Sequence, residues 1–219
     1  MSIFTLGHST HSETDFLLAA DKMQMIVDVR SHPTSRWEQH RKENLEVWLP
    51  ENRIQYLWMP SLGGWTAADY EEYHERMAAV GVDLAVYSRG QFPKQRIGAD
   101  RVASGDGPEW TSQGLYDYSW FMSTPKFLEG ADNLIKAYGG LDDPRIAIMC
   151  SEGLWWKCHR SLIADYLFWR GIFAGHLPPK PPKRLTTARF KRHSEVIGDR
   201  LLRYPAPVVA AWEAHLARK

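Results

Sequence analysis

An apolar run, a polar loop and an amphipathic segment follow one another over residues 145–170, and this order constrains the fold more than any other stretch. Residues 146–149 are all apolar, which is typical of a strand buried on both faces of a parallel sheet. From His159 onward apolar residues recur at helical spacing, and Gly171 then ends the predicted helix. The stretch therefore predicts a strand, a loop and a helix, with Cys150 at the carboxyl end of the strand.

The same alternation recurs along the rest of the chain. Apolar runs predict further strands at residues 3–7, 25–29, 55–59 and 172–177. Helical spacing and capping signals predict helices after Ser12 and at residues 44–49, 66–79 and 125–138. Repeated strand–helix units indicate an α/β fold. We expect a three-layer, Rossmann-like arrangement in which helices flank a mainly parallel sheet.

Two regions interrupt this pattern. Residues 66–113 are interpreted as a long insertion, because turn residues at 105–108 follow a weak strand signal at 82–87. A proline-rich connector at residues 178–182 precedes segments of helical spacing at 186–202 and 205–217. The sequence therefore predicts an α/β domain over residues 1–177 and a helical C-terminal extension over residues 178–219.

Composition excludes some classes of partner. The chain has 219 residues and a formal net charge of +1, so its overall charge indicates neither nucleic-acid nor membrane binding. Two cysteines do not make a disulfide framework, which favours a reducing, cytoplasmic location. No apolar stretch approaches the ~20 residues that cross a bilayer, so no membrane partner is expected.

Polar residues and glycines follow several of the predicted strands. The carboxyl ends of parallel strands meet at one edge of a sheet, so we expect these residues to share a ligand site. The candidate catalytic residues are Cys150, Glu152 and Asp28. The candidate ligand-binding residues are His8, Ser9, Thr10, Arg30, Gly63, Gly64, His159 and Arg160.

Glu152 argues against phosphatase or arsenate-reductase chemistry. A carboxylate two residues after a nucleophilic cysteine opposes an anionic substrate, since like charges about 4 Å apart repel by roughly 4 kcal/mol at intermediate dielectric. Arg160 also lies ten positions after Cys150, which is the wrong spacing for such a loop. Glu152 is better suited to act as a general acid or base, or to accept hydrogen bonds from sugar hydroxyls or base amino groups.

Each candidate also has a structural interpretation. Cys150 suits the buried end of a strand, where small apolar residues are common. Glu152 could form an ion pair with Arg160 or Arg30. Asp28 and Arg30 could instead pair with each other and hold two loops together.

The cysteines and histidines also allow two further interpretations, metal binding and redox chemistry. Cys150, Cys158, His159 and His8 are chemically suitable zinc ligands. Their spacing matches no common structural-zinc pattern, and adjacent residues of a helix should point in different directions. We therefore predict no metal and no cofactor. Redox sensing by the two cysteines would require their Cα atoms to lie within ~7 Å of each other.

The start of the C-terminal extension is basic. It offers a weak candidate nucleic-acid contact, which competes with the simpler interpretation of a solvated helix face. The residues concerned are Lys183, Arg184, Arg189, Lys191 and Arg192.

Several motifs together resemble the family named for domain of unknown function 488. They are residues 4–10 (FTLGHST), 27–33 (VDVRSHP), 62–64 (LGG), 116–127 and the Cys-x-Glu and Cys-His-Arg-Ser-Leu-Ile-Ala-Asp pair over residues 150–165. The resemblance covers about residues 1–177. Residues 66–113 look longer than in compact members, and the tail after residue 177 has no assigned counterpart. The resemblance implies the fold and the location of the site rather than a reaction.

Two functions follow as expectations. The first is an enzyme, a hydrolase or transferase, acting on a nucleotide, nucleoside or nucleic-acid component through a Cys/Glu/Arg site at the carboxyl edge of the sheet. The second is a non-catalytic module that binds nucleic acid or protein through the basic tail. The expected ligand is a small molecule or a nucleic acid, and the sequence specifies no oligomeric state.

Overall fold

The computed structural model describes residues 2–79, 113–139, 145–178, 191–198, 201 and 204–219. The strand expected at residues 82–87, the turn at 105–108 and most of the proline-rich connector lie outside these residues. Lys183, Arg184 and Arg189 also lie outside them.

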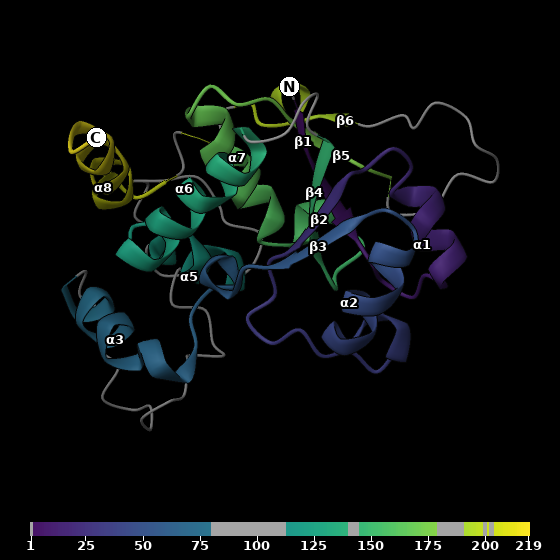
Figure 1. Cartoon of the computed structure of the whole chain (residues 1–219). Helices are drawn as coiled ribbons and strands as arrows, with labels where there is room; N and C mark the ends of the chain where they lie inside the picture. Colours follow the sequence, from purple (N-terminus) through teal and green to yellow (C-terminus); the bar gives the residue numbers. More distant parts are fainter. Residues whose placement is uncertain (1, 80–112, 140–144, 179–190, 199–200, 202–203) are drawn as a thin grey trace.

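A six-stranded sheet forms the centre of the described structure (Figure 1). Its strands are β1 (Ser2–Gly7), β2 (Met25–Asp28), β3 (Gln55–Trp58), β4 (Arg145–Cys150), β5 (Ala174–His176) and β6 (Lys191–Arg192), in the order β3-β2-β4-β1-β5-β6. The first five pair in parallel, and β6 pairs antiparallel to β5. The predicted, mainly parallel sheet is thus confirmed.

Helices cover both faces of the sheet and give the expected three layers. On one face, α1 (Glu13–Ala19) and α2 (Lys42–Glu51) pack against alternate strand residues such as Leu6 and Met149. On the other, α5 (Gln113–Phe121), α6 (Pro125–Gly139), α7 (Arg160–Trp169) and α8 (Ala206–Ala217) enclose Ile3, Ile146 and Ile148. A seventh helix, α3 (Tyr70–Ala79), adds Tyr73 to this second core. Successive strand side chains alternate between the two cores because a strand has a period of two.

Local signals in the sequence explain several element ends. Ser12 caps α1, and its hydroxyl accepts a hydrogen bond from the Asp15 N–H. Thr66 and Asp69 form a capping box before α3. Gly171 follows α7 with a φ of +74°, a conformation that glycine adopts without strain.

The prediction of a helix over residues 186–202 is wrong for the part that the structure describes. Lys191 and Arg192 form an edge strand, and residues His193–Glu195 form a single 3-10 turn. The physical reason is the fully buried His193, whose two ring nitrogens lie 2.9 Å from His176 Nε2 and 2.8 Å from an Asp165 oxygen. These buried contacts override the helical spacing. A helical tail is present further on, as α8.

The register of the sheet places the loops of interest side by side. Gly7 is paired with Cys150, and Asp28 with Met149. The loops that follow β1, β2 and β4 therefore leave the same edge of the sheet within neighbouring strands. This edge carries the candidate site.

Candidate functional site

Two cavities lie at the carboxyl edge of the sheet. The first, which we call the aromatic pocket, has a volume of about 410 Å³. It is formed by Gly63, Gly64 and Trp65, by Gly114, Leu115, Asp117 and Tyr118 of α5, and by Cys150, Glu152, Lys157, Cys158 and His159. Trp65 Nε1 donates to the Asp117 carbonyl oxygen, and the Tyr118 hydroxyl donates to the Leu62 carbonyl oxygen. Hydrogen bonds thus fix both aromatic walls.

The second cavity, the hydroxyl pocket, has a volume of about 350 Å³. It is lined by His8, Ser9, Thr10, Thr34, Ser35, Arg36, Trp37, Ser151, Glu152 and Gly153. The Arg36 guanidinium lies 5.2 Å from the centre of the Trp37 ring. Ser9 has a φ of +46°, a strained conformation for a residue other than glycine. Such strain tends to occur at functional sites.

Glu152 lines both pockets, and the buried Arg160 binds the backbone of its loop. The Glu152 side chain is exposed, and its carboxylate accepts a hydrogen bond from the Leu154 N–H at 2.9 Å. Its backbone carbonyl accepts a hydrogen bond from Arg160, which is fully buried. The ion pair with Arg160 or Arg30, which was one alternative for Glu152, is absent from the described contacts, because Arg160 binds the carbonyl and Arg30 binds Asp28.

Asp28 and Arg30 form the structural pair that the sequence offered as one alternative. The Asp28 carboxylate is fully buried and lies 2.6 Å from Arg30 Nη2. The same carboxylate accepts a hydrogen bond from the Tyr56 hydroxyl. Arg30 Nη1 lies 3.3 Å from His8 Nε2 and 3.2 Å from the Thr34 carbonyl oxygen. The pair therefore connects the loop after β2 with the loop after β1.

His8 is neutral in this arrangement. Its Nδ1 lies 3.0 Å from the Ser9 carbonyl oxygen, which can only accept, so Nδ1 carries the proton and Nε2 accepts from Arg30. Its ring stacks on His40, with the centroids 4.2 Å apart. Burial, followed by the charges of His40 and Arg30, lowers the pKa of His8 to about 3.

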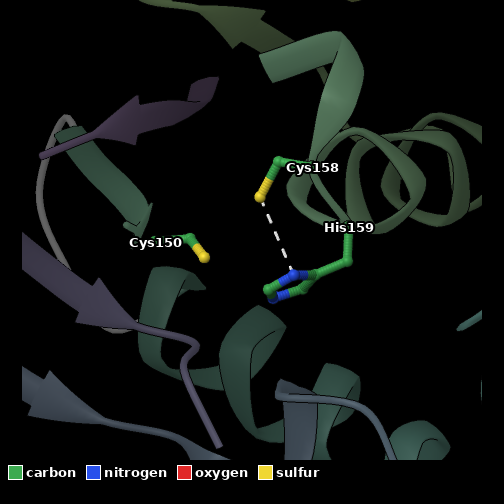
Figure 2. Close-up of side chains that lie close together, drawn as sticks. All are labelled: Cys150, Cys158 and His159. Carbon is green, nitrogen blue, oxygen red and sulfur yellow. Dashed lines mark hydrogen bonds between the residues drawn. The ribbon is translucent and has the colours of Figure 1, made fainter. Parts of the chain in front are cut away.

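The two cysteines and His159 all line the aromatic pocket, and their side chains lie close together (Figure 2). Their sulfur and nitrogen ligand atoms all lie within 4.8 Å of one another, and both cysteines are free thiols. The expectation that Cys158 and His159 point apart is wrong, since Cys158 Sγ lies 3.7 Å from His159 Nδ1. Cys158 has an extended backbone conformation just before α7, so the two side chains do not diverge as those of successive helical residues would.

The two thiols have different pKa values. A hydrogen bond from Cys150, and then the Arg160 charge, lower the pKa of Cys158 to about 6 despite burial. The same hydrogen bond and burial raise the pKa of Cys150. The sequence predicts Cys150 as the reactive thiol, whereas this asymmetry favours the thiolate at Cys158.

The structure divides the predicted site into three groups. Gly63, Gly64, Cys150, Glu152 and His159 line the aromatic pocket, and His8, Ser9, Thr10 and again Glu152 line the hydroxyl pocket. Asp28, Arg30 and Arg160 are buried supports that line neither. The aromatic pocket also contains residues that are not among the predicted site residues, namely Trp65, Asp117, Tyr118, Lys157 and Cys158. Trp65 directly follows the glycine pair, which was the one available signal for it.

In the basic tail, the structure describes Lys191 and Arg192, which are both exposed on the edge strand β6. They lie in neither pocket. Within the described residues, no helix has both the length and the apolar character that a membrane span requires.

Comparison with known proteins gives one family. The model of the family described as domain of unknown function DUF488 matches residues 12–87 and 96–167. No curated protein and no solved structure matched. The matched segments include Asp28, the glycine pair and the whole loop from Cys150 to Arg160, while β1 and residues 168–219 lie outside them. Since the match covers more than half of the chain and includes four of the five motifs noted in the sequence, the chain belongs to the DUF488 family.

Proposed function

We propose that this chain is an enzyme, a hydrolase or transferase, that acts on a nucleotide, a nucleoside or another nucleic-acid component. The observation that carries the proposal is the position of Glu152, which borders both the aromatic and the hydroxyl pocket beside two thiols and an imidazole. A general acid or base needs such a position, within reach of a bond that lies between two bound parts of a substrate.

The aromatic pocket suits a nucleobase. Trp65 and Tyr118 supply ring surfaces, and stacking of a base on an aromatic side chain contributes about 1–3 kcal/mol. Asp117 and Glu152 supply carboxylates, which accept hydrogen bonds from base amino groups. Lys157 is exposed at the same pocket and can pair with a phosphate.

The hydroxyl pocket suits the sugar or phosphate of the same ligand. Ser9, Thr10, Thr34 and Ser35 offer hydroxyl groups, and Arg36 offers a guanidinium. Hydroxyl groups and arginine are common partners of sugar and phosphate oxygens. In this arrangement Asp28, Arg30 and Arg160 act as positioning residues, because they orient the loops that line the pockets. We place the activity in the cytoplasm, where two free thiols would stay reduced.

The test is a panel of bases, nucleosides, nucleotides and short oligonucleotides, with products followed by liquid chromatography and mass spectrometry. We expect Glu152→Gln to lower turnover by about 10²–10⁴-fold, the usual contribution of a general acid or base. Glu43→Gln, on the exposed side of α2, is the matched control and should leave turnover unchanged. Equal turnover in wild type and Glu152→Gln, or no turnover of any panel member, would overturn the proposal.

Binding is measured separately from turnover. Trp65 lines the pocket and Trp37 lines the neighbouring one, so their fluorescence reports on different sites. We expect bases and nucleosides to change the fluorescence of wild type and of Trp37→Phe, but much less that of Trp65→Phe. A response that depends on Trp37 alone would place the base in the hydroxyl pocket and contradict the assignment.

The alternative is a non-catalytic module that binds nucleic acid through the basic tail. Its support in the described residues is the exposed pair Lys191 and Arg192. Deleting the tail would not test it cleanly, because Trp212 of α8 is 1 % exposed and belongs to the core. The double variant Lys191→Gln, Arg192→Gln is the better probe. The alternative predicts that it weakens DNA or RNA binding and lowers its salt dependence, while Glu152→Gln binds normally.

A further inference from the structure

Three residues that line the aromatic pocket have ligand atoms of the kind that bind zinc, and these atoms lie close together. Figure 2 shows the sulfur of Cys150, the sulfur of Cys158 and the imidazole of His159 facing a common space. All lie within 4.8 Å of one another, and Cys158 Sγ lies 3.7 Å from His159 Nδ1. Tetrahedral zinc, with bonds of about 2.3 Å to sulfur and 2.0 Å to nitrogen, holds such ligand atoms roughly 3.5–3.8 Å apart. The distances between these three ligand atoms are therefore close to those in a tetrahedral zinc site.

The backbone explains why neighbouring residues can share this space. Cys150 ends β4 on the same face as Ile146 and Ile148, toward α7. Cys158 has an extended conformation (φ −127°, ψ 145°), whereas His159 has a helical one (φ −55°, ψ −21°). This change of conformation turns the two side chains toward each other, which two successive helical residues could not do.

The hydrogen bond on the far side of His159 fixes its tautomer. His159 Nε2 lies 3.2 Å from the Val29 carbonyl oxygen, which can only accept, so Nε2 carries the proton. The lone pair of Nδ1 then faces Cys158. Metal-binding histidines are oriented in the same way, by a carbonyl or carboxylate that accepts from the other ring nitrogen.

Charge at the site suits a divalent ion held by two thiolates. Arg160 Nε donates to Cys158 Sγ at 3.3 Å, and a hydrogen bond of this kind stabilises a thiolate. The positive charge of Arg160 opposes an added cation, but two thiolates offset the double charge of zinc. Thiolate and imidazole donors together favour zinc over magnesium or calcium, which prefer oxygen.

We propose that Cys150, Cys158 and His159 bind one Zn²⁺ ion and that its fourth position opens into the aromatic pocket. Three protein ligands with one open position are typical of catalytic zinc sites, whereas structural sites have four. All three residues line the pocket, so a water on the fourth position would meet the bound substrate there.

The catalytic role of this ion rests on the proposed function, although the binding of the ion does not. A zinc-bound water would lose one proton to the Glu152 carboxylate and become a hydroxide, with no change in oxidation state. Zinc-dependent nucleobase deaminases likewise carry a general-base Glu two residues after one of their ligands. Cys150 and Glu152 have that spacing here.

The test is a titration of metal-free, reduced full-length protein with Zn²⁺ against a chelating indicator, and with Co²⁺ followed by absorption. We expect one equivalent of Zn²⁺ to bind. Co²⁺ should give a thiolate-to-cobalt charge-transfer band and the intense visible bands of a tetrahedral ion. Cys150→Ser, Cys158→Ser and His159→Gln should each lower the affinity by more than about 100-fold, beyond the usual effect of a lost ligand-orienting partner. His32→Ala, at an exposed histidine outside both pockets, should not.

Four outcomes would overturn the metal site. They are no saturable binding, an octahedral cobalt spectrum without a thiolate band, affinity that survives all three ligand variants, and a Cys150–Cys158 disulfide that forms in place of metal binding. The two proposals fail in different ways. Bound zinc without turnover of any panel member refutes the proposed function and leaves the site, whereas full turnover in zinc-free protein refutes the role of the ion and leaves the function.

Discussion

His8 and His40 are buried as neutral rings between the loop after β1 and the start of α2, and this makes folding sensitive to acid. Burial is the main cause that lowers the pKa of His8 to about 3 and that of His40 to about 4, from 6.5 for an exposed histidine. Between these values and 6.5 the unfolded chain binds more protons than the folded one. Stability should therefore be complete above pH 6.5 and should fall as the pH drops toward 4.

Urea unfolding between pH 7 and pH 4.5 measures this effect. Each histidine should contribute a slope of at most about 1.4 kcal/mol per pH unit. We expect His8→Asn to reduce the slope by up to about 1.4 kcal/mol per pH unit, the contribution of one proton, while His32→Ala leaves the slope unchanged. Ordinary carboxylates are almost fully ionised above about pH 5.5, so a slope between pH 7 and about pH 5.5 that is the same in all three proteins would contradict the assignment.

Single residues also show the limit of prediction from sequence. The position of Cys150 and Glu152 after a strand could be predicted, because an apolar run ends there. The contacts of each side chain could not be predicted, since they depend on distances between loops that are far apart in sequence. Cys158 received little weight for this reason. Its low pKa comes from Cys150 and Arg160, and its contact with His159 depends on a backbone change just before α7.

At the scale of elements, the β1 strand and the loop after β4 are packed too closely for any side chain at Gly7. An added Cβ would lie 2.7 Å from the Gly153 Cα, 2.9 Å from Arg160 Nη2 and closer still to the Glu152 carbonyl oxygen. We expect Gly7→Ala to push this loop away and to lower the free energy of unfolding by about 1–3 kcal/mol, the usual cost of overpacking.

Urea unfolding with Gly139→Ala as the control tests this. A Cβ at Gly139, the last residue of α6, meets nothing within 4 Å among the described residues. That variant should be neutral or should stabilise by up to about 1 kcal/mol, since alanine favours helix. Equal stability of Gly7→Ala and wild type would show that the loop yields without strain.

Helices and strands with a clear periodicity of apolar residues could be predicted. Elements that depend on contacts with residues distant in sequence could not. The strands β1 to β5 and the helices α1, α2, α6 and α7 follow apolar runs, caps or helical spacing. The sequence pattern does not specify the α5 helix, because aromatic residues lie on both of its faces. At the β6 strand helical spacing predicts a helix, whereas pairing with β5 and the burial of His193 are long-range effects that the pattern does not contain.

At the scale of the whole molecule, the C-terminal helix belongs to the same core cluster as Tyr118, Cys150 and Cys158 of the aromatic pocket. Trp212 of α8 contacts the rings of Tyr166, Trp169 and Tyr204, and its Nε1 donates to the Met122 carbonyl oxygen. We expect Trp212→Ala to lower the free energy of unfolding by about 3–5 kcal/mol. Leu216→Ala, at a 37 % exposed position of the same helix, should cost less than about 1 kcal/mol.

The sequence predicts residues 178–219 as an extension of the α/β domain. Guanidinium unfolding followed by two probes tests whether this extension unfolds together with the domain. One cooperative transition, shifted by Trp212→Ala at all probes, would show that the tail and the α/β domain unfold together. A separate early transition of α8 would instead support the extension as an independent unit.

The sheet order also has a consequence for synthesis on the ribosome. Among the described strands, β1 pairs with β4 and β5 alone, so residues 2–7 have no described strand partner until residues 145–150 have been made. At about 5–20 residues per second, translation of the intervening chain takes roughly 7–28 s. During that time the apolar side chains of Ile3, Phe4 and Leu6 lack the sheet that buries them in the folded protein, so we expect chaperones to bind this segment of the nascent chain.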